Sequence, residues 1–504
     1  IQRQSHTPSF YIDPEVMRIF SPRIISCLNG TGVVNLHQEL SHLSELSATE
    51  FFRSHELIAH IFFTDEMNPY RELTYEKAEF EYIPLLPISW RSQTSSAQKE
   101  STPQCTYTRL IQDILTCYNY LQERDKMKAK TKTDILPRFS VASTYNMRTA
   151  MGMGMPTQVR RGTAWTSVSN FVMDLSIGHY ERWPQCPDLL RKPWKYVVEL
   201  PYVSMSSAYA SPRVRSQRLP ADRPTTFHFS GHFNLYGPEL VCSVRNTILQ
   251  ISSERADLQV VNASLGAAEG PISTGLLRAI GSSSFCLVAR GDSYSSSLFY
   301  HAVSQGCVPL VISDWFVFSF PWLVPYERFV LRISEEDFLR DPHGSLDAVR
   351  ASFLSNGSSG SPSLLAAMRE HMARAAPLLS WDPVPSSGGF LTVRPLELLL
   401  QELRHHRTPH GRYNNVPCTR PYMCRWDRYN QSVRVQAWVT PYVEPSSAAP
   451  RTTEKPRDYT FFRAVKPGDP AQWSLTPYAA NYSTQPPHLP AASPATYSLK
   501  DIGY

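Results

Sequence analysis

Apolar residues follow two patterns along this chain of 504 residues. Short unbroken apolar runs bounded by Gly, Pro or Ser are typical of strands buried on both faces of a parallel sheet. Apolar residues spaced three and four apart indicate amphipathic helices. Both patterns meet between positions 285 and 314. There an apolar run, Phe285 to Ala289, precedes a polar turn, a short helix broken by Gly306, and a second run, Val308 to Ile312. The segment predicts a β-turn-α-β unit with adjacent parallel strands.

The carboxyl ends of such strands open onto a crevice in which open α/β sheets bind ligands. The turn Gly291-Asp292-Ser293 and the start of the next helix would meet there. Because backbone N–H groups at a helix N-terminus attract phosphate, the unit predicts a nucleotide site. The candidate donors and close-approach residues are Gly231, Arg245, Arg290, Gly291, Ser293, Ser295 and Ser296.

Helical spacing also marks 106–128, 364–376 and 395–406, the last with four leucines on one face. Together with the runs it predicts an α/β chain in four parts. These are a Rossmann-like domain at 1–205, a Ser/Arg/Pro-rich linker at 206–225, a second Rossmann-like domain at 226–406, and an extended Pro/Ser/Tyr-rich extension at 407–504. A tail so poor in self-burial gains order by lying on a partner chain or by wrapping its own domains, and both alternatives stay open.

Composition narrows the choice of function. A net charge of +6 without a basic run argues against nucleic-acid binding. No run of 18 apolar residues occurs, so no membrane span is expected. The chain begins at Ile1 rather than Met, which fits a removed targeting peptide or anchor.

Cysteine usage excludes a zinc site, because the nine cysteines include no CxxC pair and no Cys/His ligand spacing. Cys286 and Cys307 lie on adjacent predicted strands and form either a disulfide or two buried thiols. Five N-x-S/T sequons slightly favour the secretory route. They are Asn29, Asn262, Asn356, Asn430 and Asn481.

The same 285–314 segment resembles the exostosin family, glycosyltransferase family 47. The matching motifs are Phe285-Cys286-Leu287, Gly291-Asp292-Ser293, Gly306-Cys307-Val308-Pro309 and Ser313-Asp314. Weaker matches in the expected order extend the resemblance over roughly 15–375, including Thr226 to Gly231 with Arg245 on the next helix. Two positions depart from the family pattern, since Leu298 and His301 stand where the family has an Arg and an acidic residue.

The resemblance implies a GT-B-type fold, in which two Rossmann-like domains face a cleft. It implies inverting transfer of a sugar from a UDP-sugar to a glycan hydroxyl in the Golgi lumen, with an N-terminal membrane anchor outside this sequence. No Asp-x-Asp metal motif stands at an obvious position, so no essential metal or other cofactor is expected.

Roles for single residues follow from this resemblance and from chemistry. Glu181 is a candidate acceptor-side base, and Asp292 is either catalytic or an N-cap of the next helix. His301 would hydrogen-bond a ribose hydroxyl, and Asp314 lies on a loop beyond a strand end. The alternative is a catalytically degenerate exostosin fold, recruited as a structural subunit of a larger, possibly organellar, assembly. In that case the C-terminal tail would bind partner chains.

Overall fold

The computed structural model divides the chain into two compact units. Ile1–Leu200, Trp381–Asn415 and Ser498–Tyr504 form the first unit, and Pro201–Ser380 and Val416–Tyr497 form the second. The structure describes residues 7–29, 58–60, 62–85, 107–142, 171–172, 175–179, 196–202, 223–231, 243–262, 274–289, 296–313, 316, 318–320, 323–354, 364–381, 384–385, 391–407, 423–427, 432–436, 460–463 and 478–479.

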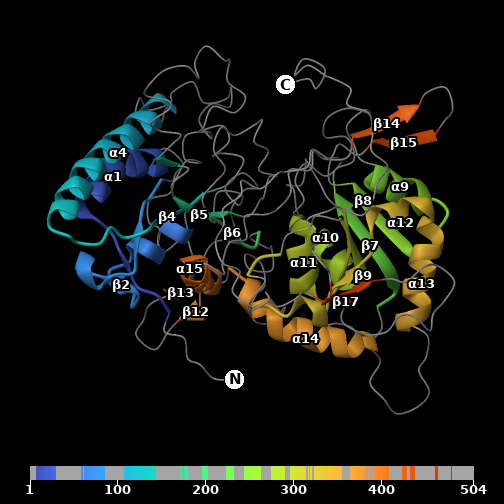
Figure 1. Ribbon diagram of the computed structural model, residues 1–504. Coiled ribbons are helices and arrows are strands. Elements are labelled where there is room, and N and C mark those ends of the chain that lie inside the picture. The colour runs from blue at the N-terminus through green and yellow to red at the C-terminus, as the bar shows by residue number, and fades with distance from the viewer. Residues whose placement is uncertain are drawn as a thin grey trace. The chain divides into compact units, whose positions relative to one another are not determined.

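The first unit contains a sheet of parallel strands in the order β2-β1-β3-β4-β5-β6. The strands are β1 (Phe10–Tyr11), β2 (Arg71–Glu72), β3 (Phe80–Tyr82), β4 (Arg138–Val141), β5 (Ser176–His179) and β6 (Tyr196–Glu199). Helices α1 (Pro14–Asn29) and α4 (Tyr107–Lys130) contact each other beside it (Figure 1). Buried rings of Phe10, Phe63, Tyr82 and Phe139 pack in the sheet core, in edge-to-face and tilted contacts.

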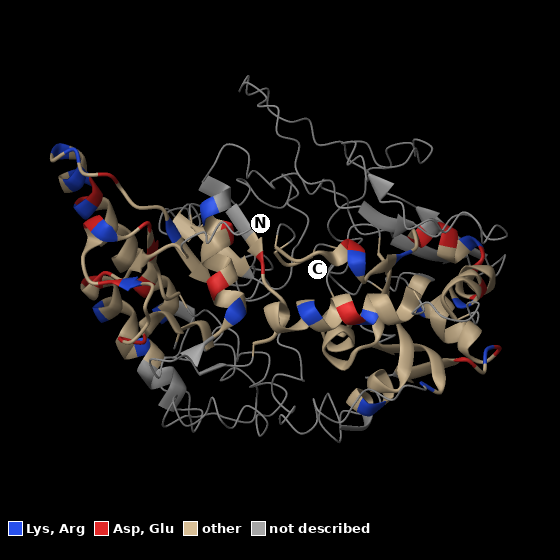
Figure 2. Cartoon of the chain, turned by 90° about the horizontal axis from the view of Figure 1, so that it is seen from below, with Lys and Arg blue, Asp and Glu red and all other residues tan. Residues whose placement is uncertain are grey.

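A charged network is buried where α4 crosses β3. Arg124 donates to both carboxylate oxygens of Glu81 at 2.6 and 2.7 Å and also binds Asp13. Arg138 links Glu81 to Asp125. Figure 2 shows acidic and basic residues alternating along this end of the helix. The three carboxylates offset the two guanidiniums, so the charges are mutually paired.

Helix α15 (Arg394–Arg407) belongs to the first unit, although it follows the second unit in sequence (Figure 1). Its buried Leu399 packs at Gly178 of β5, and Glu397 accepts a hydrogen bond from Tyr70 at 2.7 Å. Arg404 pairs with Glu79. The structure therefore places residues 381–407 with the first sheet, whereas the sequence-based boundary kept everything up to 406 in the second domain.

The second unit contains a sheet in the order β17-β16-β11-β10-β9-β7-β8. Its strands are β7 (Thr225–Gly231), β8 (Leu258–Asn262), β9 (Ser283–Ala289), β10 (Val308–Ile312), β11 (Leu331–Arg332), β16 (Thr460–Arg463) and β17 (Tyr478–Ala479). All described pairings are parallel except that of β16 with β17. Two short hairpin pairs accompany the sheets: β12 (Val384–Pro385) with β13 (Leu391–Thr392), and β14 (Met423–Asp427) with β15 (Ser432–Gln436).

Helices lie on both sides of this second sheet (Figure 1). On one side α9 contacts α12 and α13, and on the other α11 contacts α10 and α14. The helices are α9 (Ser243–Ser252), α10 (Thr274–Gly281), α11 (Ser297–Gln305), α12 (Glu335–Arg340), α13 (Pro342–Leu354) and α14 (Leu364–Leu379). Both units are thus α/β with parallel sheets, as the apolar runs predicted.

The predicted β-turn-α-β unit is confirmed. Strands β9 and β10 are adjacent and parallel, with Phe285 in register with Val308. Every side chain of both strands is buried, which explains the unbroken apolar runs. Gly306 ends α11 in the left-handed conformation, at φ 72°, where its N–H caps carbonyls of the last turn. A side chain would be strained there, so glycine is required.

Two strands of the C-terminal extension join the second sheet. β16 pairs in parallel with β11, and β17 continues the sheet from β16. Residues 460–463 and 478–479 of the extension thus add edge strands to their own chain's sheet, whereas β14 and β15 pair with each other. Among the described residues, no helix is long and apolar enough to cross a membrane.

Candidate functional site

The strand order of the second sheet defines one place where a ligand crevice can open. β7 lies between β8 and β9. After β7 the chain forms β8 at one edge of the sheet, and it then crosses back to form β9, β10 and β11 on the other side of β7. This reversal is the topological switch point of a doubly wound sheet, and ligands bind beyond the carboxyl ends of the strands that flank it. Here those ends are Gly231 of β7 and Ala289 of β9.

Gly231 and Arg245, which the sequence assigned to the same nucleotide site, lie close together at this point. A Cβ on Gly231 would lie 3.6 Å from Nη1 of Arg245 and 3.0 Å from Cζ of Phe229. The guanidinium carbon of Arg245 lies 6.0 Å from the centre of the Phe229 ring. Arg245 is on α9 and is partly exposed, so a guanidinium and a glycine share the carboxyl edge. An arginine fork beside a glycine suits a diphosphate.

The N-terminus of α11 follows the carboxyl end of β9. Ser296 holds the N-cap position in extended conformation, at φ −145° and ψ 130°, and its hydroxyl makes no capping hydrogen bond. Helix α11 has nine residues, and its first N–H groups add a partial positive charge to the carboxyl edge.

His301 and Leu298, the two departures from the family pattern, are both buried in α11, with 4% of each residue exposed. Burial lowers the pKa of His301 to about 4, so its imidazole is neutral near pH 7. The ribose contact assigned to His301 stays a prediction, and this burial counts against it.

Arg332, which the sequence analysis did not single out, organises the carboxyl end of β10. Its Nη2 donates to the backbone oxygen of Ser313 at 2.9 Å. Ser313 is fully buried and directly precedes Asp314. An arginine inside the apolar run from Phe329 to Ile333 was the signal that marked it.

The remaining site predictions lie outside the described residues, so the structure does not test them. These are Glu181, Arg290, Gly291, Asp292, Ser293, Ser295 and Asp314. The sequons Asn356, Asn430 and Asn481 also lie outside, and only the backbone is described at Asn29 and Asn262. No group of three His, Cys, Asp or Glu side chains that could hold a metal occurs within the described ranges, and the expectation of no essential metal stays a prediction.

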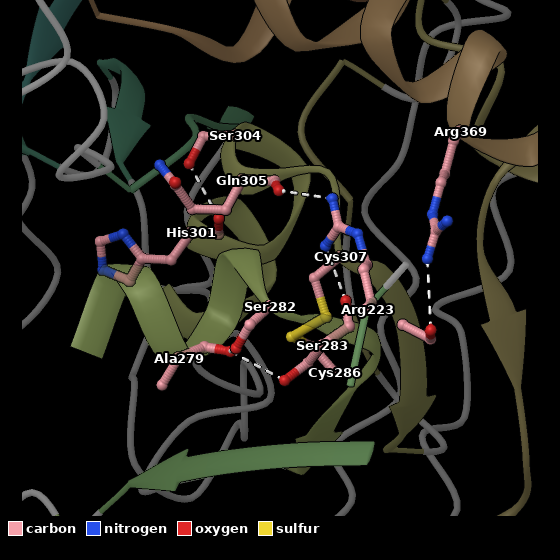
Figure 3. The surroundings of a disulfide bond; sticks show 11 residues. Arg223, Ala279, Ser282, Ser283, Cys286, His301, Ser304, Gln305, Cys307 and Arg369 are labelled. Atoms are coloured by element: carbon pink, nitrogen blue, oxygen red, sulfur yellow. Dashed lines mark hydrogen bonds between the residues drawn. A yellow bond between two sulfur atoms is a disulfide. The ribbon is translucent and has the colours of Figure 1, made fainter. Parts of the chain in front are cut away.

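Of the two alternatives for Cys286 and Cys307, the disulfide is present, closing a loop of 21 residues in sequence separation (Figure 3). It ties β9 to the residue that precedes β10, and so fixes the end of α11 against the sheet. Disulfides persist in oxidising compartments, so the bond is what a secreted or lumenal protein would have.

The fold defines an α/β protein with two parallel-strand sheets. In comparisons with known proteins, residues 153–348 match the family model of the Exostosin GT47 domain. This segment contains Gly231, Arg245 and the whole β9–α11–β10 unit. The resemblance to the exostosin family, glycosyltransferase family 47, is therefore confirmed.

Two curated relatives are similar to parts of the chain. A protein named probable xyloglucan galactosyltransferase GT17, from Arabidopsis thaliana, is 22% identical over 292 residues, which is 56% of this chain and 58% of the relative. An Exostosin-1 homolog from Caenorhabditis elegans is 35% identical over 63 residues, 12% of this chain and 16% of the relative. The chain thus spans less than two thirds of either relative.

Proposed function

We propose that this protein is an exostosin-type glycosyltransferase that transfers a sugar from a UDP-sugar to a glycan hydroxyl with inversion. The pairing of Gly231 with Arg245 at the switch point, inside the segment that matches the family domain, carries the proposal. One relative is named a probable galactosyltransferase and the other an exostosin homolog, and both names support an exostosin-type glycosyltransferase.

In this proposal the second unit holds the donor. The Arg245 fork binds the diphosphate, Gly231 lets it approach the backbone, and the N-terminus of α11 complements its charge. The first unit would bind the acceptor across a GT-B-type cleft. Transfer with inversion then needs a base that takes the proton of the acceptor hydroxyl, and Glu181 is proposed for that role.

The proposed location is the Golgi lumen, through family membership. The Cys286–Cys307 disulfide supports an oxidising compartment independently of the family.

The alternative is a catalytically degenerate exostosin fold that serves as a subunit of a larger assembly. One observation favours it. The positions where the family has an Arg and an acidic residue are Leu298 and His301, both buried. Losing one charge-assisted contact weakens binding by about 1.5 to 3 kcal/mol, or roughly one to two decades. In this alternative the C-terminal extension would also bind partner chains.

Calorimetric titration with a panel of UDP-sugars separates the two functions. The glycosyltransferase binds at least one donor, and Arg245→Gln weakens that binding by roughly one to two decades. The matched control is Arg350→Gln, because Arg350 is a half-exposed arginine that pairs with Asp257 on the same unit. No heat with any donor, or equal losses in both variants, would favour the structural subunit.

A second measurement tests the base. Glu181→Gln should leave donor affinity unchanged and lower the rate of transfer by a factor of about 100 or more, because the base acts only on the acceptor. A variant with an unchanged rate would remove Glu181 from the mechanism without affecting the donor site.

A further inference from the structure

A pair of arginines lies at the opposite edge of the second sheet, where β9 begins. Arg223, just before β7, donates from Nη1 to the backbone oxygen of Ser283 at 2.6 Å and from Nη2 to that of Gln305 at 3.2 Å. Arg369 on α14 donates from Nη2 to the hydroxyl of Ser284 at 3.3 Å. Figure 3 shows both side chains, with Arg223 beside the disulfide. We call Arg223 and Arg369 the amino-edge arginine pair.

Within the part of the chain that the structure describes, the partners of this pair are neutral. Among the described residues no carboxylate lies within ion-pair distance of either guanidinium, and the buried Nε of each makes no hydrogen bond. Three arginines that are more deeply buried than this pair have charged partners. Arg23, Arg124 and Arg255 each form an ion pair with an aspartate or glutamate. Both arginines are partly exposed, but the Nε–H of each is a buried donor without an acceptor, and such a donor requires an explanation.

The two guanidiniums also affect each other. Burial first, and then the positive charge of Arg369, lowers the pKa of Arg223 to about 9. Burial likewise lowers the pKa of Arg369. The bond from Arg223 to Gln305 caps the C-terminus of α11, whose dipole offers about half a negative charge. The two guanidiniums carry two positive charges, so the helix dipole leaves more than one of them without a compensating negative charge.

We propose that the amino-edge arginine pair binds a compact, doubly charged tetrahedral oxyanion of the phosphate or sulfate class. Guanidinium forks match the oxygens of such anions, and the two free Nε–H groups would gain acceptors. The hydroxyl of Ser284 is a neighbouring polar group. Because parallel strands share a direction, the start of β9 and the carboxyl end of β7 lie at opposite edges of the sheet. The site is therefore separate from Gly231 and Arg245.

The source of the anion is either a free inorganic ion or an ester on a larger molecule. The test measures thermal unfolding of the full chain with sodium phosphate, sodium sulfate or methyl phosphate, each at constant ionic strength balanced with sodium chloride. Phosphate and sulfate should raise the melting temperature by a few degrees at saturating concentration, beyond chloride. An equal effect of methyl phosphate would assign the site to an esterified ligand, and a smaller one to the free ion.

Three variants locate the effect. Arg369→Gln should weaken the apparent affinity for phosphate by about tenfold or more. It should leave stability without the anion unchanged or higher, because it removes an unpaired charge. Arg350→Gln is the surface control, and Arg245→Gln should retain the phosphate effect. If Arg369→Gln does not fold, Arg369→Lys replaces it, and the loss of the fork should still weaken binding.

Two outcomes would overturn the proposal. One is stabilisation no greater than that from chloride. The other is an effect that survives in Arg369→Gln and disappears in Arg245→Gln, which would place the anion at the donor site. Because donor binding is measured separately with UDP-sugars, failure here leaves the proposed transferase function standing.

Discussion

Arg124 and Glu81 form a bidentate ion pair between α4 and β3, with both side chains almost completely removed from solvent. The guanidinium of Arg124 also lies 5.2 Å from the centre of the Tyr75 ring, on which Lys128 stacks from 3.3 Å. Burying these charges is costly, and the mutual pairing offsets the cost only while every partner is present.

Glu81→Gln should therefore destabilise the first unit strongly. The substitution removes the bidentate carboxylate of Arg124, which keeps only Asp13 and the more distant Asp125, and it removes a partner of Arg138. The free energy of unfolding should therefore fall by about 3 to 5 kcal/mol. Chemical denaturation measures this loss. The control is Glu123→Gln on α4, the helix that carries Arg124. Glu123 forms an exposed pair with Lys126, so its loss should lower the free energy of unfolding by less than about 1 kcal/mol. Similar losses in both variants would contradict a buried network.

Leu399→Ala tests the assignment of α15 to the first unit. Leu399 is fully buried and packs at Gly178, so its truncation should cost about 2 to 5 kcal/mol. The unfolding of the first unit should be affected, which hydrogen exchange at β5 and β6 would show. Leu249→Ala, at a leucine that is 44% exposed on α9, is the matched control and should cost much less. Faster exchange confined to the second sheet would refute the assignment.

The helix itself was predictable, but its neighbour was not. Leucines 396, 399, 400 and 403 lie on one face, and that spacing predicts a buried helix correctly. It carries no information on which sheet receives the face. The contacts that decide it, Tyr70 with Glu397 and Arg404 with Glu79, join residues more than 300 positions apart. By contrast β9, α11 and β10 follow from local signals. An apolar run marks each strand, and the left-handed Gly306 marks the end of the helix.

Gly231→Ala should weaken donor binding. The added Cβ would lie 3.0 Å from a ring carbon of Phe229, so the ring must shift, whereas the 3.6 Å to Nη1 of Arg245 is an ordinary contact. We expect the affinity for the best UDP-sugar to fall about tenfold or more, since backbone approach is lost as well. Gly281→Ala is the control, because its nearest neighbour, Oε1 of Gln305, is at an ordinary 3.7 Å. Equal affinities in the two variants would exclude a close approach at Gly231.

The site was less predictable than the fold for a physical reason. Gly231 and Arg245 stand on different elements, and the distance between them and their place at the switch point follow only from the structure. Arg223 and Arg369 are 146 positions apart and sit at the amino edge, where no motif marks them. Sequence patterns report which faces are buried, whereas a site depends on which strand ends meet.

Removing the Cys286–Cys307 disulfide should destabilise the second unit. In the double variant Cys286→Ala, Cys307→Ala, the two positions are 21 residues apart in sequence and are no longer cross-linked. The greater chain entropy of the unfolded state should lower the free energy of unfolding by about 3 kcal/mol. Reduction with dithiothreitol should lower the free energy of unfolding of the wild type by a similar amount. It should not lower that of the double variant, which has no disulfide at this position. Cys117, a buried free thiol whose pKa burial raises, should resist alkylation in the folded state. Equal stability of oxidised wild type and double variant would remove the structural role.

Stability should fall as the pH drops below 6.5, and His301 should account for a defined share. Burial lowers its pKa to about 4 in the folded protein, whereas an unfolded histidine titrates near 6.5. Between these values the unfolded chain binds a proton that the folded chain does not, so unfolding becomes more favourable as pH falls.

From pH 7 to pH 5 this share is about 2 kcal/mol, because each pH unit below 6.5 contributes about 1.4. Denaturation of wild type and His301→Leu at both pH values gives the double difference, which should equal that share. Buried His60 and His228, each with its pKa lowered to about 4, keep part of the acid sensitivity in the variant. His343→Gln, at a surface pair with Glu254, is the control and should keep the wild-type pH dependence far more closely.

If His301→Leu lost as much stability between pH 7 and 5 as wild type, His301 would have to accept a proton in the folded protein. It would then be available as a hydrogen-bond donor on both nitrogens, which would restore the case for a ligand contact from α11.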